Sequence, residues 1–483
     1  MKPSAVLWLR IDLRIGDNPA LLATIRHGGA VIPVFIHAPN EEDPWPPGGA
    51  SDWWLHQSLA ALDKNFRETG SRIIFRRGPA LETLRALVKE TGATGVFWNR
   101  RYEPGVSARD STIKDALRAD GLKADSYNAA LLFEPWTVKN KSEKPFQVFT
   151  PYWKHCLTLD EPHEPLRAPE KIPAPDAWPK SLALKDLALE PRINWTDGFR
   201  PAWTPGEAGA RESLKNFLSR AVGDYSENRN RPDLAGTSRL SPHLHFGEIS
   251  PRQVWHTLKA FVGKHGLKPV QWHGSQFLTE IGWREFAQHL LFHFPRTTDE
   301  PLRREFEKFP WRDDKKHLRA WQKGLTGFPV VDAGMRELWT TGWMHNRVRM
   351  ITASFLVKDL LQPWQSGAKW FWDTLVDADL AQNSLGWQWT AGCGADAAPY
   401  FRIFNPTTQG EKFDPNGDYI RRWCPELAKL SSEWIHQPQA APPEILRAAG
   451  IELGKDYPKP VVNHAAAREA ALAAFAKLKP SAK

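Results

Sequence analysis

Cysteine, long apolar runs and a secretory leader are scarce or absent in this chain. Its three cysteines, Cys156, Cys393 and Cys424, stand far apart, which excludes a disulfide framework and a CxxC metal site and favours a reducing compartment. No leader-like segment opens the sequence, and no run approaches the roughly 20 apolar residues that a membrane span needs. We therefore expect a soluble, cytoplasmic protein that requires no metal.

What the chain has in quantity is length, positive charge and tryptophan. Its 483 residues are 41% hydrophobic and 25% charged, enough for about two or three globular domains. The net charge of +9 favours a polyanionic partner, although many basic proteins bind no nucleic acid. The 24 tryptophans far outnumber the 7 tyrosines, and core packing alone would account for most of them.

The first part of the chain, residues 1–132, alternates short apolar runs with amphipathic segments. The runs predict strands at 5–9, 31–36, 72–75 and 95–98 with a weaker one near Ala124, and helices at 52–69 and 80–91. Strict alternation predicts a doubly wound, Rossmann-like α/β domain with a parallel sheet and its ligand at the carboxyl ends of the strands. No GxGxxG follows the first strand, so an ordinary dinucleotide site is not expected there.

The rest of the chain divides into a connector and a helical domain. Residues 133–203 carry 11 prolines and little periodicity, which predicts a long interdomain linker that is not itself a folded module. Residues 204–483 are predicted to form an all-α domain that ends in an Ala-rich terminal helix at 464–478. Its predicted helices are 208–221, 253–262, 271–294, 329–341, 346–360 and 369–375.

Four short motifs in the helical part carry the chemistry, and a fifth lies near the N-terminus. They are GWMHNRVRM at 342–350, DADLAQN at 377–383, GWQW at 386–389 and FNPTTQGEK at 404–412, with RIDLRIGDNPAL at 10–21. Together they closely resemble the photolyase and cryptochrome family, with Ile11 standing where a second Arg is usual. In the N-terminal motif, Asp17 could instead be a simple helix N-cap.

The resemblance implies an FAD-binding helical domain with two groups of contacts. On residue grounds alone, the hydroxyls and the cation at 236–241 suit a phosphate cradle, although the same letters also make a good helix start. The implied diphosphate contacts are Tyr225, Thr237, Ser238, Arg239, Leu240 and Ser241, and the implied ring contacts are Arg284, Asn346, Arg349, Asp377, Asp379 and Asn383.

Alternatives stay open for several of these ring contacts. Asp377 and Asp379 could be a capping or turn pair, whereas the resemblance pairs Asp377 with Arg349 and bonds Asp379 to the flavin. Glu280 and Arg284 could form a buried structural ion pair. Asn346 is treated as a mid-helix residue, a position where Asn needs a local reason, and the resemblance places its amide at the flavin N5.

The resemblance also assigns catalytic and DNA-binding roles. Trp387, Trp364 and Trp311, in that order outward, are the implied electron relay, although core packing would explain any one of them; Trp339, Trp343, Trp370 and Trp372 could add a branch. The implied lesion pocket and its basic rim comprise Glu280, Trp283, Asn346, Met350, Trp389, Arg347, Gln409 and Lys412, with Arg229 and Arg231 nearby. A solvated basic face is the alternative for each arginine taken singly.

Within the family, a photolyase that acts on cyclobutane pyrimidine dimers fits best. Asn346 and Met350 stand where (6-4) photolyases typically carry His, and Asn346 where plant cryptochromes usually carry Asp. The implied catalytic set is the three relay tryptophans with Asn346 and Glu280, acting in a monomer on UV-damaged DNA. A cryptochrome-type light receptor and a generic basic DNA-binding module are the rivals.

A second, antenna chromophore is also implied by the resemblance. Methenyltetrahydrofolate comes first and a deazaflavin second, with Gly105 and Val106 in the places where folate-binding relatives often have Asn and Glu. The run at 48–55 looks closer to branches near the plant cryptochromes.

Overall fold

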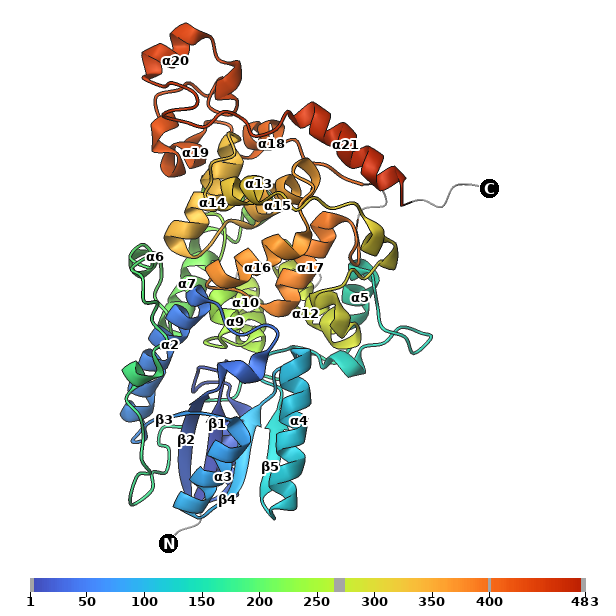
Figure 1. Cartoon of the computed structure of the whole chain (residues 1–483). Coiled ribbons are helices and arrows are strands. Elements are labelled where there is room, and N and C mark those ends of the chain that lie inside the picture. The colour runs from blue at the N-terminus through green and yellow to red at the C-terminus, as the bar shows by residue number, and fades with distance from the viewer. Residues whose placement is uncertain (1–3, 265–273, 398–400, 479–483) are drawn as a thin grey trace.

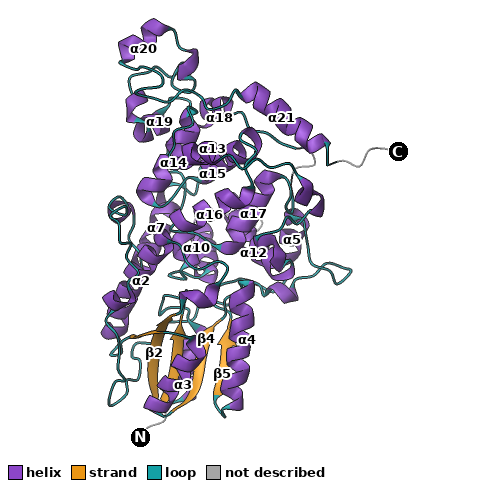
Figure 2. Cartoon of the chain, in the orientation of Figure 1, coloured by secondary structure: helices purple, strands orange, loops and turns teal. Residues whose placement is uncertain are grey.

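The computed structural model describes residues 4–264, 274–397 and 401–478. Figure 1 shows an α/β domain at the N-terminal end and a larger body of helices stacked on it, and Figure 2 shows that the strands gather in the first domain. Within the described ranges, no helix is long and apolar enough to cross a membrane.

The α/β domain is built on a five-stranded sheet of order β3-β2-β1-β4-β5 in which every pairing is parallel. Its strands are β1 (Ser4–Leu9), β2 (Ala30–His37), β3 (Ile74–Arg77), β4 (Ala93–Asn99) and β5 (Lys123–Tyr127). All the strands predicted from sequence are therefore confirmed, and the doubly wound class with them. Because β1 pairs with β2 on one side and with β4 on the other, the topological switch point lies between β1 and β4.

Helices cover both faces of this sheet. They are α1 (Pro19–His27), η1 (Pro39–Glu42), α2 (Gly49–Glu68), α3 (Ala80–Thr91) and α4 (Pro104–Ala119). Helix α2 begins earlier than predicted, where its glycines meet the helical domain: a Cβ on Gly48 would lie 2.4 Å from the Cα of Asp373. The Gly49 N–H donates to the Asp373 carboxylate at 3.0 Å, so the two domains touch through bare backbone.

The connector at 133–203 runs largely without regular structure, as predicted, but part of it folds. Its short helices are η2 (Pro135–Thr137), α5 (Phe149–Cys156), η3 (Leu184–Leu187) and α6 (Phe199–Ala202). Tyr152 and Trp153 of α5 are buried in the core of the helical domain, and a Cβ on Gly282 would lie 2.5 Å from the Trp153 ring. The segment around α5 is thus part of the second domain, which the proline count concealed.

The described helices of the second domain run from α7 to α21, and its Ala-rich terminal helix is confirmed. Its α-helices are α7 (Glu207–Arg220), α8 (Tyr225–Asn228), α9 (Ser241–His245), α10 (Pro251–Lys264), α12 (Gln276–His293), α13 (Lys315–Gln322), α14 (Pro329–Thr341), α15 (Asn346–Ser354), α16 (Trp364–Thr374), α17 (Leu380–Ala391), α18 (Pro406–Phe413), α19 (Asp418–Trp423), α20 (Pro443–Ala449) and α21 (His464–Ala476). Shorter turns are η4 (Pro295–Thr298), η5 (Arg304–Lys308), the π-helical η6 (Phe355–Asp359), η7 (Pro425–Leu427) and η8 (Pro438–Ala440).

Helices α12 and α15 correspond to two of the predicted helices. The predicted helix at 271–294 begins at residues outside the described ranges, and α12 covers its remainder. Asn346 is the first residue of α15 and not a mid-helix residue, because His345 caps the helix by accepting from the Arg347 N–H. The expectation that Asn346 lies mid-helix, where Asn needs a local reason, is therefore wrong, since the first turn tolerates Asn well.

Buried charged groups join the two domains. The Arg14 guanidinium donates to the Gly247 and Ala129 carbonyls at 2.8 and 2.7 Å. Asp17, at φ 49°, accepts from Arg252 at 3.0 Å, while the residue that caps α1 is Asn18. The N-cap reading of Asp17 is therefore wrong, and this carboxylate instead ties the first domain to the second.

Candidate functional site

One face of α17 carries two of the predicted ring contacts and the inner tryptophan of the predicted relay. Asp379, Asn383 and Trp387 follow one another at i, i+4 and i+8, which places them on a single stripe of the helix. The stripe faces α12 on one side and α16 on the other, and both helices pack on α17. Any planar group beside this stripe would meet a carboxylate, an amide and an indole in turn.

Asp379 is both the N-cap of α17 and part of a wider network. Its carboxylate accepts from the Gln382 N–H at 2.9 Å and from the Gln288 amide at 3.1 Å, and it lies 3.7 Å from His245 Nδ1. Burial opposes its ionisation, but His245 and Arg284 still leave the pKa of Asp379 below its usual range. The capping alternative is therefore confirmed for Asp379, but capping does not account for its other neighbours.

Asp377 pairs with Arg349, as the resemblance implies. The guanidinium Nη2 lies 3.0 and 2.8 Å from the two carboxylate oxygens, and Nε donates to the Met344 carbonyl at 2.7 Å. Because Asp377 is buried, the arginine supplies the charge that such a carboxylate requires.

The predicted phosphate cradle contains a cation with free donors. Arg239 has a left-handed backbone at φ 52° and lies between two indoles, with its guanidinium carbon 4.0 Å from the Trp203 ring centre and 4.9 Å from that of Trp343. Its buried Nε has no hydrogen-bond partner in the described part of the chain. Ser241 begins α9 beside it, and its Oγ accepts from the Trp343 indole at 3.3 Å. Buried orphan donors of this kind fit an anionic group such as the FAD diphosphate.

The other cradle residues differ in how they are placed. Tyr225 on α8 is buried among Phe217 and Phe277, and burial, together with the nearby Glu280 charge, raises its pKa. Ser238 Oγ accepts from the Leu240 N–H at 3.4 Å, which shapes the loop. Thr237 is half-buried in the same turn.

Helix α12 presents three predicted residues, but not as an ion pair of its own. Glu280 pairs with Arg229 and accepts from Gln276 at 2.7 Å, whereas Arg284 donates to the Ala130 carbonyl at 2.8 Å. The Glu280–Arg284 pairing considered as an alternative is therefore wrong. Trp283 stacks on the Phe149 ring, with the ring centres 3.8 Å apart.

The three predicted relay tryptophans share one hydrophobic cluster. Trp387 and Trp364 are 2% and 1% exposed, and Trp311 is partly buried at the edge of the same cluster. Trp387 packs on α16 at Gly367, where a Cβ would lie 2.0 Å from the ring, and Trp364 is the first residue of that helix. The Arg312 N–H donates to the Leu361 carbonyl at 2.7 Å, which brings Trp311 toward the start of α16. Exposure therefore rises only at the outer residue, as a relay to the surface requires.

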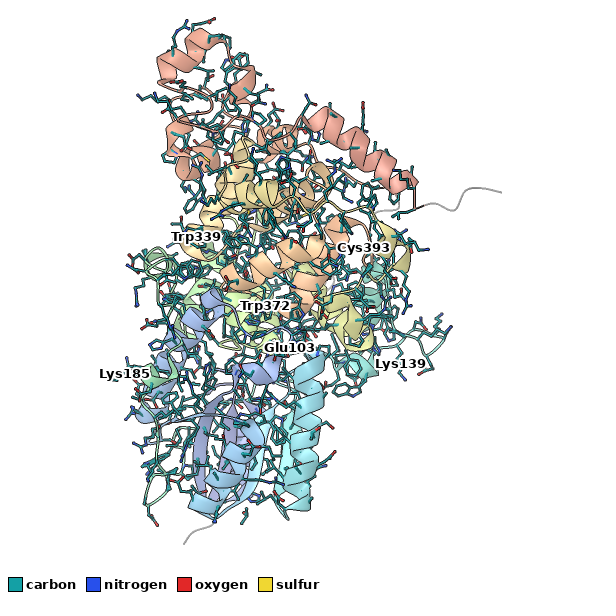
Figure 3. All side chains as sticks on the ribbon, viewed as in Figure 1. Glu103, Lys139, Lys185, Trp339, Trp372 and Cys393 are labelled. Atoms are coloured by element: carbon teal, nitrogen blue, oxygen red, sulfur yellow. The ribbon has the colours of Figure 1, made fainter. Side chains whose placement is uncertain are left out.

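Trp339 and Trp370 form a second tryptophan pair outside this row. Their rings stack with centres 5.9 Å apart, and Trp195 lies 4.9 Å from Trp339. The branch considered from the sequence stays a prediction. Figure 3 shows Trp339 and Trp372 on the side of the molecule where α16 meets α2.

The basic rim predicted for DNA is partly formed by paired groups. Arg347 donates to Asn230 at 2.7 Å and lies over the Phe413 ring at 4.4 Å, and the exposed Lys412 lies over the same ring at 5.3 Å. Arg231 pairs with Asp233. Asn346 is exposed, and Met350, Trp389 and Gln409 are half-buried. The described residues contain no cluster of His, Cys, Asp and Glu that could hold a metal ion.

A cleft whose lining includes several charged side chains lies between the two domains, at the switch point of the sheet. Residues after β1 and β4 line it, among them Arg10 and Glu103, and across from them stand Arg284, Gln288 and Asp379. Figure 3 places Glu103 at this boundary. A second cleft opens at the ends of β1 and β2 and reaches Trp372. The predicted location of a ligand at the carboxyl ends of the strands therefore coincides with two clefts.

Sequence reasoning missed several residues of this region. Glu285 accepts from the Leu132 and Phe133 N–H groups at 2.8 and 3.2 Å, and burial raises its pKa to about 7. His245 and Gln288 flank Asp379. A histidine or glutamine in an amphipathic helix gives no sequence signal of such a partner.

Comparison with known proteins agrees with this geometry. Residues 5–175 match the family described as DNA photolyase, and residues 277–477 match the FAD binding domain of DNA photolyase. The chain is 51% identical to a deoxyribodipyrimidine photo-lyase of Agrobacterium fabrum over 98% of each chain. It is 43% identical to cryptochrome-1 of Arabidopsis thaliana, over 95% of this chain and 68% of that protein.

The structural comparison gives the same result. A crystal structure of a bacterial class III photolyase from Agrobacterium tumefaciens superposes with a TM-score of 0.95 at 50% identity, covering 99% of this chain and 98% of that one. The fold and the site thus define an FAD-binding protein with an α/β domain and a helical domain. The chain belongs to the photolyase and cryptochrome family.

Proposed function

We propose that this protein is a light-dependent deoxyribodipyrimidine photo-lyase that splits cyclobutane pyrimidine dimers in DNA. The observation that carries the proposal is the α17 stripe, which joins the Asp379 network to Trp387 and so to the tryptophan row. The 51% identity to a protein named deoxyribodipyrimidine photo-lyase supports the same reaction. Bound, reduced FAD would supply the photochemistry, by transferring one electron to the dimer and taking it back after the ring opens.

The protein's own residues would bind the diphosphate and the ring of the cofactor and would return electrons to it. Arg239 and the hydroxyls of Ser238, Thr237 and Ser241 suit the diphosphate. The Arg349–Asp377 pair and Asp379 suit the polar edge of the ring, together with Asn383, whose amide N–H donates to the Ala368 carbonyl at 3.0 Å. Trp387, Trp364 and Trp311 would return electrons to an oxidised cofactor from the surface.

The dimer would stack beside the cofactor after it leaves the duplex, as is known for enzymes that act on extruded bases. Trp283 and Trp389 supply aromatic walls, and a stacked base gains roughly 1–3 kcal/mol. Glu280 and the exposed Asn346 are polar contacts for the pyrimidine edges, and Arg229 holds Glu280 in place. Arg347, Gln409 and Lys412 would contact the flanking phosphates. Because Asn346 and Met350 cannot relay protons, the cyclobutane dimer is favoured over the (6-4) product.

We also propose a second chromophore at the cleft beside β2. Methenyltetrahydrofolate is favoured and a deazaflavin is the alternative. The cleft combines an apolar wall of Phe35, Ile36 and Leu55 with Arg109 and the Trp372 indole, which suits a large conjugated ring with an anionic tail. Absorption and fluorescence spectra of chromophore released from denatured protein would distinguish the two.

The protein is further proposed to act as a monomer in the cytoplasm. Its three cysteines are free and buried, which suits a reducing compartment.

A direct test uses purified, reduced protein and an oligonucleotide that contains a cyclobutane dimer. Blue light should remove the dimer, and the same sample kept in the dark should not. Unchanged dimer content after illumination, with flavin bound, would favour the second candidate, a light receptor, which the 43% identity to a cryptochrome supports. A protein that never takes up flavin would exclude both.

A further inference from the structure

A buried carboxylate on α14, Glu337, has no part in the site described so far. Its side chain is held by two donors on the same oxygen: the Tyr419 hydroxyl at 2.7 Å and the His345 N–H at 3.2 Å. Glu337, Tyr419 and His345 are 8%, 0% and 3% exposed. The carboxylate therefore joins α14, α19 and the turn that leads from α14 into α15.

That turn carries residues of the flavin site. It runs from Gly342, at the end of α14, through Trp343 and Met344 to His345. Asn346 follows directly, and Arg349 grips the turn from the other side through the Met344 carbonyl at 2.7 Å. The C-terminal end of the turn is thus held at two adjacent residues, by Glu337 at the His345 N–H and by Arg349, itself paired with Asp377, at the Met344 carbonyl.

The charge of Glu337 also has a specific counterpart. Burial raises its pKa, while the charges of Arg239 and Arg349 act in the opposite direction, so both guanidinium groups lie within its field. Arg349 already has Asp377 as an ion-pair partner at 2.8 Å. Arg239 has no ion-pair partner within the described ranges, and its guanidinium is shared between the Trp203 and Trp343 rings.

Holding the turn would not by itself require a charged group. The oxygen of a Gln side chain could accept the same two hydrogen bonds, whereas a buried carboxylate carries a desolvation cost of several kcal/mol. A negative charge that persists here must therefore be offset by the nearby cations, and in turn it alters the field in the cavity that they line.

We propose that Glu337 is a positioning residue of the flavin site, which holds the 342–345 turn in place and sets the electrostatic field in which the flavin is reduced. The inference rests on the proposed flavin site. It adds a residue outside the predicted contacts. The length of the Glu337 side chain would position the 342–345 turn, and its charge would set the reduction potential of the flavin.

Two variants separate these roles. Glu337→Gln removes the charge and keeps the length, and the flavin midpoint potential should rise because a more positive site favours the anionic, reduced ring. Glu337→Asp keeps the charge and withdraws it from Tyr419 and His345. The potential should then stay near the wild-type value, while the affinity of the apoprotein for FAD should fall about fivefold, because the two hydrogen bonds from Tyr419 and His345 are weakened together.

Glu426→Gln is the matched control. Glu426 lies on the neighbouring η7 and pairs with Arg336 at 2.7 Å. Its ion-pair partner is therefore a different arginine from Arg239. Spectroelectrochemical titration of the flavin gives the potential, and fluorescence titration of FAD into apoprotein gives the affinity. An unmoved potential in folded, flavin-loaded Glu337→Gln, or an equal shift in Glu426→Gln, would overturn the proposal.

If Glu337→Gln fails to take up flavin, Glu337→Asp is the deciding variant. Because Asp keeps the negative charge, a changed flavin midpoint potential in this variant would contradict the proposed role of the charge. Failure of the wild-type protein to bind flavin would instead refute the proposed function. The two failures are therefore distinguishable.

Discussion

Gly367 on α16 packs directly against Trp387, the inner tryptophan of the predicted relay. A Cβ at this position would lie 2.0 Å from Cη2 of Trp387 and 2.5 Å from Cζ3, atoms of a ring that is 2% exposed. The indole cannot bend, so Gly367→Ala must push α16 and α17 apart or rotate the ring. Overpacking of this kind costs about 1–3 kcal/mol, from which Ala recovers about 0.5–1 kcal/mol through its better helix propensity.

Gly386→Ala is the internal control for this change. Gly386 lies on the exposed face of α17, and nothing stands within 4 Å of a Cβ placed there. Alanine should stabilise that position by about 0.5–1 kcal/mol; because Gly367→Ala gains the same helix propensity, the two variants should differ in unfolding free energy by the overpacking cost, about 1–3 kcal/mol. Urea denaturation measures this difference, and the rate of flavin photoreduction reports the displacement of Trp387. Equal stability and equal photoreduction in the two variants would refute the packing argument.

Three further predictions concern the relay, the DNA rim and pH. Trp387→Phe should slow flavin photoreduction but spare repair by chemically pre-reduced enzyme; equal loss of both activities would contradict the relay. Binding of dimer-containing DNA should weaken with salt at a slope of about −0.9 per neutralised phosphate, and Arg347→Gln should reduce the slope by about one contact. An unchanged slope would remove Arg347 from the rim. Burial raises the pKa of Glu285 from its ordinary value of 4.5 to about 7. The unfolding free energy should therefore fall as the pH rises between these two values and then level off. Glu285→Gln should flatten this trend by up to about 3 kcal/mol in denaturation across that range, and an identical profile would contradict it.

The sequence predicted the strands because buried parallel strands are continuous apolar runs, and these runs stand out from amphipathic helices. Their order could not be predicted, since a run of Val and Ile records that a strand is buried and not which strand lies beside it. The proline-rich connector misled in one place. Phe149, Tyr152 and Trp153 form a helix there, and their aromatic spacing was overshadowed by the prolines on either side.

Site residues were predictable where the motif itself named them, and less so where tertiary partners decide. Glu280 and Arg284 stand four apart on α12 and suggest a local ion pair, yet Arg229 and the Ala130 carbonyl bind them instead. Arg349 and Asp377 are 28 residues apart, and only the resemblance paired them. Glu337 gave no signal, because a Glu in an amphipathic helix is usually at the solvent-facing side.

The links between the domains suit the second chromophore that we propose beside β2. Energy transfer between two chromophores depends steeply on their distance and orientation, so a mobile connector between the domains would lower its efficiency. Here the donors of Arg14 reach carbonyls in both the helical domain and the end of the first domain, and Glu285 fixes the start of the connector through two N–H groups. These groups are buried, and breaking any of them would leave an unpaired charge or a free N–H, which costs more than a surface contact. The cleft beside β2 and the α17 stripe are therefore held in one fixed relation, which is the condition that light harvesting across the interface requires.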